Sequence, residues 1–186
     1  MEAAFIYFSL SHKNYIAIDF LAKRIIIVGY PDRTFKPGRH INRAELTKIL
    51  VETVAGTPSE TDYKDCFPDV HSGWFEPYVC YAKAQGWVGG YPDGTFRAAQ
   101  TVADVEALKM ILNANSIVVA DPKEAPFKDV AIGQWFTGFV YTAKEMNLLE
   151  ETGVYYEPGK AMTRAAVAEI MYRVIVMKES ESSRFS

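Results

Sequence analysis

One seven-residue segment occurs twice in this 186-residue chain and returns a third time in altered form. The two close copies, GYPDRTF at 29–35 and GYPDGTF at 90–96, lie 61 residues apart, and the altered copy is at 152–156. Self-similarity at a fixed period of this size is typical of chains built from repeated supersecondary units. The sequence therefore predicts three related units, with little chain outside them.

The repeated segment has the composition of a tight turn. Proline presets φ for the second position of such a turn, aspartate bonds the backbone ahead of it, and glycine tolerates positive φ. The aromatic residues at the two ends are suited to anchoring the turn on a core. Arg33 stands in the first copy where the second has Gly94, so the first turn must have a geometry that a residue with a side chain can adopt.

Amphipathic helical patterns flank the turns. Apolar residues precede the second and third turns at 78–82 and 139–143. They recur with i, i+3, i+4 spacing in helices that open at Asn42 and Thr163. Asn42 and Thr163 are favourable N-caps, and Glu45 completes a capping box with Asn42. The pattern predicts an all-α chain of three helix–turn–helix units, unit one at 1–56, unit two at 63–118 and unit three at 125–178, followed by a flexible polar tail at 179–186.

Further motifs repeat together with the turn. FPDV at 67–70 and FKDV at 127–130 are each followed by a tryptophan, Trp74 or Trp135, and the helices after the first and third turns open with NRAE or TRAA. These motifs in this order resemble the S-layer homology (SLH) motif, and three in tandem resemble a complete SLH domain. The resemblance covers about residues 13–178.

The resemblance implies both a fold and a function. It implies a pseudo-threefold helical prism whose grooves between motifs hold a bacterial secondary cell-wall polysaccharide, often one that bears ketal-linked pyruvate. It also implies non-covalent anchoring at the cell surface, with other surface-layer proteins as further candidate partners. A protein–protein assembly scaffold with vestigial grooves is the alternative.

An acidic sugar needs a cation for its carboxylate and an aromatic face for its ring. Arg43 and Arg164 can supply planar forks, and the free N–H groups of the first helical turn can also attract an anion. The alternative is that these arginines are solvated or pair with Glu45. Trp74 and Trp135 are equally suited to stacking and to a core position, while Asp69 and Asp129 favour a capping or turn role. The candidate polysaccharide-binding residues are Arg43, Arg164, Trp74, Trp135, Asp69, Asp129, Glu45 and Gly90.

Two units depart from the motif. Unit two has Asp104 where the others have arginine, which would repel an anionic sugar, and Lys109 one turn later compensates only in part. Unit three has Ala166 in place of the glutamate, and its turn reads ETGV at 151–154. We therefore expect one or two of the three grooves to bind.

Composition excludes several other classes of function. The net charge of −3, without a Lys/Arg cluster, argues against nucleic acid. No apolar run is long enough for a membrane span. The three histidines are scattered, so no metal or cofactor is expected, and no nucleophile–base pair indicates an enzyme. Asp69, Asp129 and Glu45 do not stand out as a glycosidase pair. Cys80 is expected to be buried and inert, with a disulfide to Cys66 the less favoured reading.

The N-terminus fits the motif poorly. Lys13 falls where the later units have tryptophan, and no Phe-x-Asp-Val precedes it. Residues 1–10 are apolar but lack a basic region and a clear cleavage site, so they make no convincing signal peptide. Because a surface anchor must be exported, we expect the chain to be a fragment or to have a misplaced start.

Overall fold

A computed structural model describes residues 10–150 and 153–186. The predicted signal segment and the start of the third turn lie largely outside these residues. The described chain forms α-helices without a β-sheet, so the all-α prediction is confirmed. The helices are α1 Tyr15–Lys23, α2 Arg43–Val54, α3 Glu76–Ala84, α4 Asp104–Ala114, α5 Thr137–Glu145 and α6 Arg164–Glu179. No helix in the described part is both long and apolar enough to cross a bilayer.

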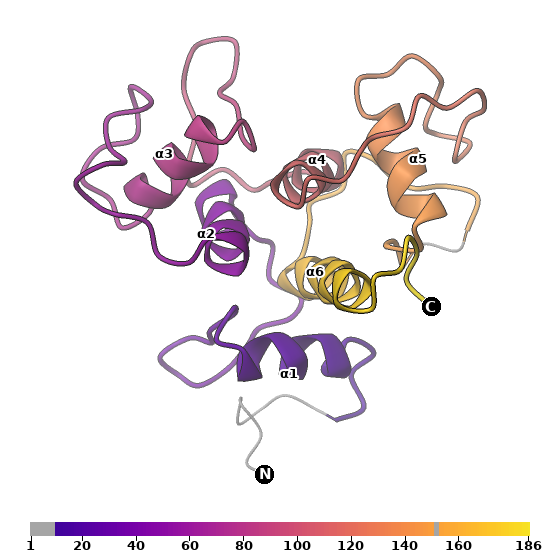
Figure 1. Ribbon diagram of the computed structural model, residues 1–186, viewed down its shortest axis with the longest axis horizontal. Coiled ribbons are helices and arrows are strands. Elements are labelled where there is room, and N and C mark those ends of the chain that lie inside the picture. The colour runs from indigo at the N-terminus through magenta and orange to yellow at the C-terminus, as the bar shows by residue number, and fades with distance from the viewer. Residues whose placement is uncertain (1–9, 151–152) are drawn as a thin grey trace.

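The three longer helices lie in the middle of the molecule and the three shorter ones lie outside them (Figure 1). Each outer helix packs on the long helix of another unit: α3 on α2, α5 on α4, and α1 on α6. The helix pairs that pack are therefore not the pairs joined by a turn. The units interlock, and the contact of α1 with α6 brings the two ends of the repeat together.

A ring of three backbone hydrogen bonds closes the centre. The N–H of Ile41 donates to the carbonyl of Met162 (3.0 Å), Met162 donates to Val102 (3.0 Å), and Val102 donates to Ile41 (3.1 Å). All three residues are buried and occupy the same position in their units, just before the long helix. Equivalent residues of the three units thus surround one point.

Local capping explains where the long helices begin. Asn42 Oδ1 accepts the N–H of Glu45 (2.8 Å), and the Glu45 carboxylate accepts the N–H of Asn42 (3.1 Å), as the capping-box prediction requires. Thr163 Oγ1 accepts the N–H of Ala166 (3.2 Å). These bonds satisfy N–H groups that have no partner inside the helix.

The turns are anchored through their aromatic ends. Phe35, Phe96 and Tyr156 are buried, and Phe96 lies against Phe67 with ring centroids 5.4 Å apart. Arg33 and Gly94 both have positive φ, at 62° and 81°. The first turn therefore places a non-glycine residue in the left-handed region, at a cost of about 1–2 kcal/mol.

Two expectations about the periphery differ from the structure. The expectation of an inert Cys80 was wrong: Cys66 and Cys80 form a disulfide with their Cα atoms 5.3 Å apart, because the loop before Phe67 folds back on α3. The tail is held at one residue. Phe185 donates its N–H to the Met146 carbonyl (3.0 Å), and its own carbonyl accepts from Nδ2 of Asn147 (2.9 Å).

Candidate functional site

Arg43 and Arg164 each reach across to the turn of another unit. Arg43 donates from Nε to the carbonyl of Phe96 (2.8 Å) and from Nη2 to that of Gly89 (2.9 Å). Arg164 makes the same pair of bonds to Phe35 (3.0 Å) and Val28 (2.9 Å). The side chains are only 5% and 9% exposed. They are therefore neither solvated nor paired with Glu45, and each ties down both ends of a turn.

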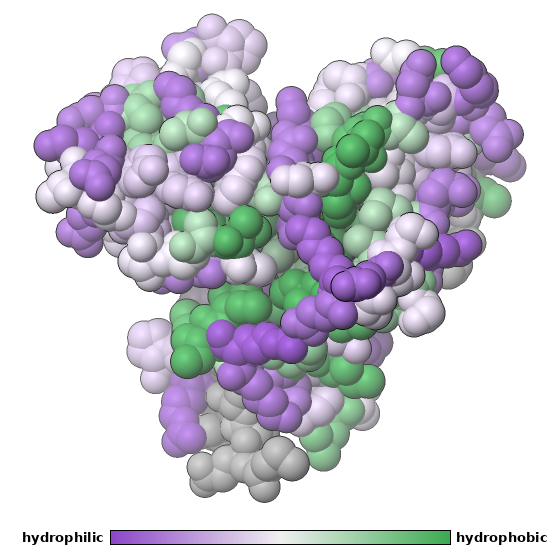
Figure 2. All heavy atoms as spheres, in the orientation of Figure 1, coloured by the Kyte–Doolittle hydropathy of each residue, from purple (hydrophilic) through white to green (hydrophobic). Residues whose placement is uncertain are grey.

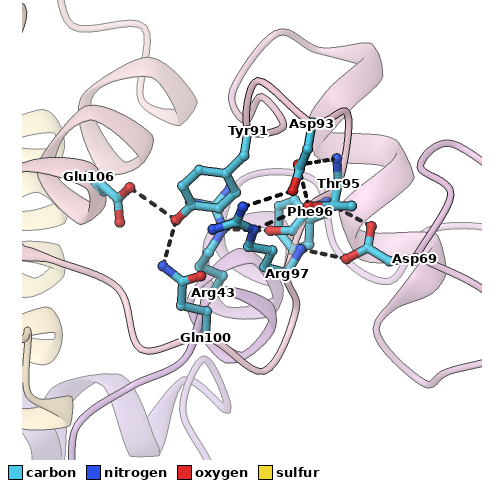
Figure 3. A network of polar contacts seen from close by, with 9 residues as sticks. All are labelled: Arg43, Asp69, Tyr91, Asp93, Thr95, Phe96, Arg97, Gln100 and Glu106. Atoms are coloured by element: carbon cyan, nitrogen blue, oxygen red, sulfur yellow. Dashed lines mark hydrogen bonds and ion pairs between the residues drawn. The ribbon is translucent and has the colours of Figure 1, made fainter.

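The arginines also lie against the aromatic rings of these turns. Figure 3 shows Arg43 beside the ring of Tyr91, with the guanidinium carbon 4.8 Å from the ring centroid. Arg164 is 5.0 Å from Tyr30 in the same way. Burial lowers the pKa of Arg164 from its usual value, but an arginine stays charged under all ordinary conditions. Among the described residues Nη1 of neither arginine has a hydrogen-bond partner, so one edge of each fork is unoccupied.

Each arginine borders a cavity, and the two cavities are built alike. Groove 1 has a volume of about 220 Å³ and groove 2 about 210 Å³. Each lies between the turn of one unit, the long helix of that unit and the tryptophan of the next. Groove 1 is lined by residues 26–30, Glu45, Lys48, Ile49, Trp74 and Arg164. Groove 2 is lined by residues 87–92, Glu106, Lys109, Met110, Trp135 and Arg43.

An exposed indole and a lysine form one wall of each groove. Trp74 is 56% and Trp135 54% exposed, so neither is a core residue. Lys48 Nζ lies 5.7 Å from the Trp74 ring centroid, and Lys109 Nζ lies 5.5 Å from that of Trp135. Neither lysine forms an ion pair within the described part of the chain. Sequence reasoning missed Lys48, although its spacing of 61 residues from Lys109 was a signal.

The acidic side chains of the grooves are engaged in local bonds. Glu45 forms an ion pair with Arg39 (2.7 Å) in addition to capping α2. Glu106 accepts a hydrogen bond from the Tyr91 hydroxyl (3.1 Å), which in turn accepts from Nε2 of Gln100 (3.0 Å; Figure 3). Their negative charge is thereby partly compensated at the groove.

Gly90 is shaped by close approach. A Cβ atom there would lie 2.8 Å from the Phe67 ring and 2.9 Å from the carbonyl oxygen of Thr95. The absence of a side chain lets the chain pass close to the turn while its backbone lines groove 2.

Asp69 and Asp129 lie outside both grooves. Asp69 accepts the N–H groups of Phe96 (2.7 Å) and Arg97 (2.6 Å; Figure 3). Asp129 accepts those of Tyr156 (2.8 Å) and Glu157 (2.7 Å). Burial raises the pKa of each carboxyl group, but these N–H donors lower it further, so the net pKa lies below the ordinary value. The geometry fits the turn role.

The first helical turns offer no free N–H group to an anion, contrary to expectation. Arg43 and Ala44 donate their N–H groups to the carbonyls of Gln100 and Ala98 (both 3.0 Å). Arg164 and Ala165 do the same to Arg39 (2.9 Å) and Pro37 (3.0 Å). In each case the acceptor belongs to the loop of another unit, so these donors stabilise the contact between units.

The structure moves the effect of Asp104 to a different place. Its N–H donates to Lys160 (2.8 Å), and it lines cavities next to Glu150. The first residue of each long helix thus faces the turn of the following unit. Unit two's turn receives Arg43, whereas unit three's turn receives the aspartate. The expectation that Asp104 spoils the groove at unit two's own turn was wrong.

The grooves lie among three lobes. Figure 2 shows apolar side chains gathering on this face between the lobe of α1 and the lobe of α2 and α3. No group of His, Cys, Asp and Glu suited to a metal ion occurs among residues 10–150 and 153–186. What the two grooves offer is cationic and aromatic chemistry.

Comparison with known proteins adds the family. A family model described as the S-layer homology domain matches residues 10–47, 67–102 and 126–168. A cellulosome-anchoring protein of Acetivibrio thermocellus is 29% identical over 128 residues, which cover 67% of this chain and 29% of that protein. The S-layer protein sap of Bacillus anthracis is 24% identical over 166 residues, which cover 86% of this chain and 20% of that protein.

These relatives are much longer than this chain, which spans less than a third of either. The three matched segments lie one in each unit and together cover more than half of the sequence. The chain therefore belongs to the S-layer homology domain family.

Proposed function

We propose that this domain attaches a protein non-covalently to an anionic cell-wall polysaccharide through grooves 1 and 2. One observation carries the proposal: an exposed tryptophan and an unpaired lysine recur beside a buried arginine, 61 residues apart, in two cavities of nearly equal volume. The buried arginines are explained by the fold. The exposed indoles and lysines are not, so their repetition supports a ligand.

The chemistry of each groove suits one acidic sugar. Lys48 or Lys109 and the open edge of the arginine supply positive charge for a carboxylate. The indole beside the lysine offers an apolar face to a sugar ring. A ketal-linked pyruvate carries a methyl group next to its carboxylate, and Ile26, Val28 and Ile49 in groove 1 offer apolar contacts for it.

Two grooves on one domain favour attachment to a polymer. Once one sugar is bound, a second unit of the same chain meets the other groove at a high effective concentration, which raises the overall affinity without any new contact. Individual grooves can therefore be weak while the anchor holds.

The printed names of the relatives agree with this role. One is a cellulosome-anchoring protein and another an S-layer protein. We extend to this chain a location at the cell wall and a non-enzymatic anchoring task. The cargo that it anchors depends on sequence beyond this domain.

Sedimentation with isolated cell-wall sacculi tests the proposal. The protein is mixed with sacculi that retain or lack their secondary polymer, and the pelleted fraction is measured. We expect pelleting only with the polymer, and a loss of at least tenfold in apparent affinity for Lys48→Met/Lys109→Met and for Trp74→Ala/Trp135→Ala. Lys123→Met is the matched control, because Lys123 is exposed on a linker away from both grooves.

These side chains are preferable to Arg43 and Arg164 as probes, because substituting the arginines also loosens the turns. Equal pelleting with stripped sacculi, or wild-type affinity in both double variants, would overturn the proposal. A folded protein that does not pellet at all would favour the assembly scaffold.

A further inference from the structure

The boundary between unit three and α1, here called the third seam, occupies the place of a third groove but has the opposite chemistry. Glu150 stands at the position of Gly90, and Glu169 at that of Lys109. Asp104 replaces the arginine, and Lys13 falls where the other units have tryptophan. A ligand carboxylate placed here would meet carboxylates instead of cations.

A buried amide joins two of these carboxylates across the seam. Asn14, which precedes α1 directly, is 1% exposed. Its Nδ2 donates to Glu150 (2.8 Å) and to Glu169 of α6 (3.1 Å). Lys13 Nζ lies 3.1 Å from the same Glu150 carboxylate. The residues that would have to open for a ligand are thus bonded to one another.

Arg173 supplies the guanidinium that is missing at position 104. Its Nη1 donates to the carbonyls of Leu149 (2.9 Å) and Asn147 (3.0 Å), and its Nε donates to Glu169 (2.8 Å). Leu149 is the equivalent of Gly89, whose carbonyl accepts from Arg43. The same backbone carbonyl is therefore held by a guanidinium in all three units, but in unit three the arginine comes from farther along that unit's own helix α6.

We infer that the third seam is a structural latch, centred on Arg173 and Asn14, that has replaced ligand binding and fastens α1 to α6 at the closure of the ring. The charges support this role, because Glu169 is bonded by both Arg173 and Asn14, and Glu150 by both Asn14 and Lys13. Resting also on the proposed function, the inference gives the domain two polymer sites instead of three.

Amide hydrogen exchange tests the latch without any ligand. Arg173→Met keeps much of the side-chain volume but removes the bonds to Glu169, Asn147 and Leu149. We expect exchange at least tenfold faster in α1 and at 147–150, with α3 and α4 unchanged. Arg24→Met is the matched control, since Arg24 also joins α1 to α6, through Glu179, but in an exposed pair.

Arg173→Lys is the milder variant should Arg173→Met not fold. It keeps the charge but cannot hold three acceptors with a planar fork, so we expect an intermediate acceleration confined to the same segments. Wild-type exchange in α1 in either folded variant, or acceleration spread evenly over all helices, would overturn the latch.

Native mass spectrometry counts the sites. The probe is a synthetic methyl glycoside of an N-acetylhexosamine bearing a ketal-linked pyruvate. We expect at most two probes per wild-type chain, one after Lys48→Met/Trp74→Ala or after Lys109→Met/Trp135→Ala, and none when all four changes are combined. A third probe, or one that survives in the combined variant, would overturn the two-site inference. No binding to the wild type would refute the proposed function for this sugar, while hydrogen exchange still decides the latch.

Discussion

Arg43 and Gly89 are 46 residues apart, yet Nη2 of Arg43 donates a hydrogen bond of 2.9 Å to the carbonyl oxygen of Gly89. Arg164 makes the equivalent bond to Val28 across 136 residues. Both arginines are buried, and both also hold the far end of the same turn. The residues that open the long helices therefore join neighbouring units as well as bordering the grooves.

Truncating either arginine is expected to destabilise the fold. Arg43→Ala leaves the carbonyls of Gly89 and Phe96 without their charged donor, and hydrogen bonds to charged groups contribute about 1.5–3 kcal/mol each. We expect a loss of about 2–4 kcal/mol in the free energy of unfolding, measured by urea denaturation. Arg184→Ala in the exposed tail is the control and should stay within about 0.5 kcal/mol of wild type. An Arg43→Ala protein as stable as this control would contradict the structural role.

The close approach at Gly90 gives a matched pair of glycine variants. A Cβ at position 90 meets the Phe67 ring and a backbone carbonyl below 3 Å, whereas one at position 89 meets nothing within 4 Å. Overpacking of this kind costs about 1–3 kcal/mol. We expect Gly90→Ala to lower the thermal midpoint clearly and Gly89→Ala to leave it nearly unchanged, as measured by calorimetry. Equal midpoints for the two variants would contradict the geometry.

The disulfide between Cys66 and Cys80 is expected to stabilise unit two. It closes a loop over a separation of 14 residues, for which the chain-entropy model gives about 3 kcal/mol. Reduction, or Cys66→Ser/Cys80→Ser, should lower the thermal midpoint by several degrees. Thiol titration must first show that both cysteines are paired in the untreated protein. An unchanged midpoint after complete reduction would show that α3 holds this loop without the bond.

Acid should weaken the fold through Asp69 and Asp129. The N–H donors of Phe96 and Arg97 keep the pKa of Asp69 below its ordinary value despite partial burial. A carboxyl group whose pKa is lowered by folding stabilises the protein above its unfolded pKa of about 3.9. That stabilisation is lost as the pH falls from there through the folded-state pKa.

Asp69→Asn should therefore lower the free energy of unfolding at pH 7 and flatten its decline below about pH 4. The measurement is urea denaturation from pH 7 to pH 2. Asp121→Asn is the control, because that carboxylate is exposed on a linker. If Asp69→Asn keeps both the stability and the acid slope of wild type, the proposed loop anchoring is absent.

Local features were predictable from the sequence because they depend on neighbouring residues. The 61-residue repeat, the helical periodicity and the Asn42–Glu45 capping box each involve a few consecutive turns of chain, and the structure contains all three. Arg43 and Trp135 were correctly singled out as groove residues by motif, although their companion Lys48 was missed.

Contacts between distant residues were decided only by the tertiary structure. Periodicity does not say which helices pack, so α1 against α6, the cysteine pair and the place of Asp104 followed only from the interlocked units. Arg173 matches no repeated motif, and its bonds to Leu149 exist because α6 passes beneath that loop. The sequence by itself determined the repeated all-α units and their caps, since these are local. The tertiary structure decided which arginine serves which turn, and which seam is latched, since these depend on the closure of the ring.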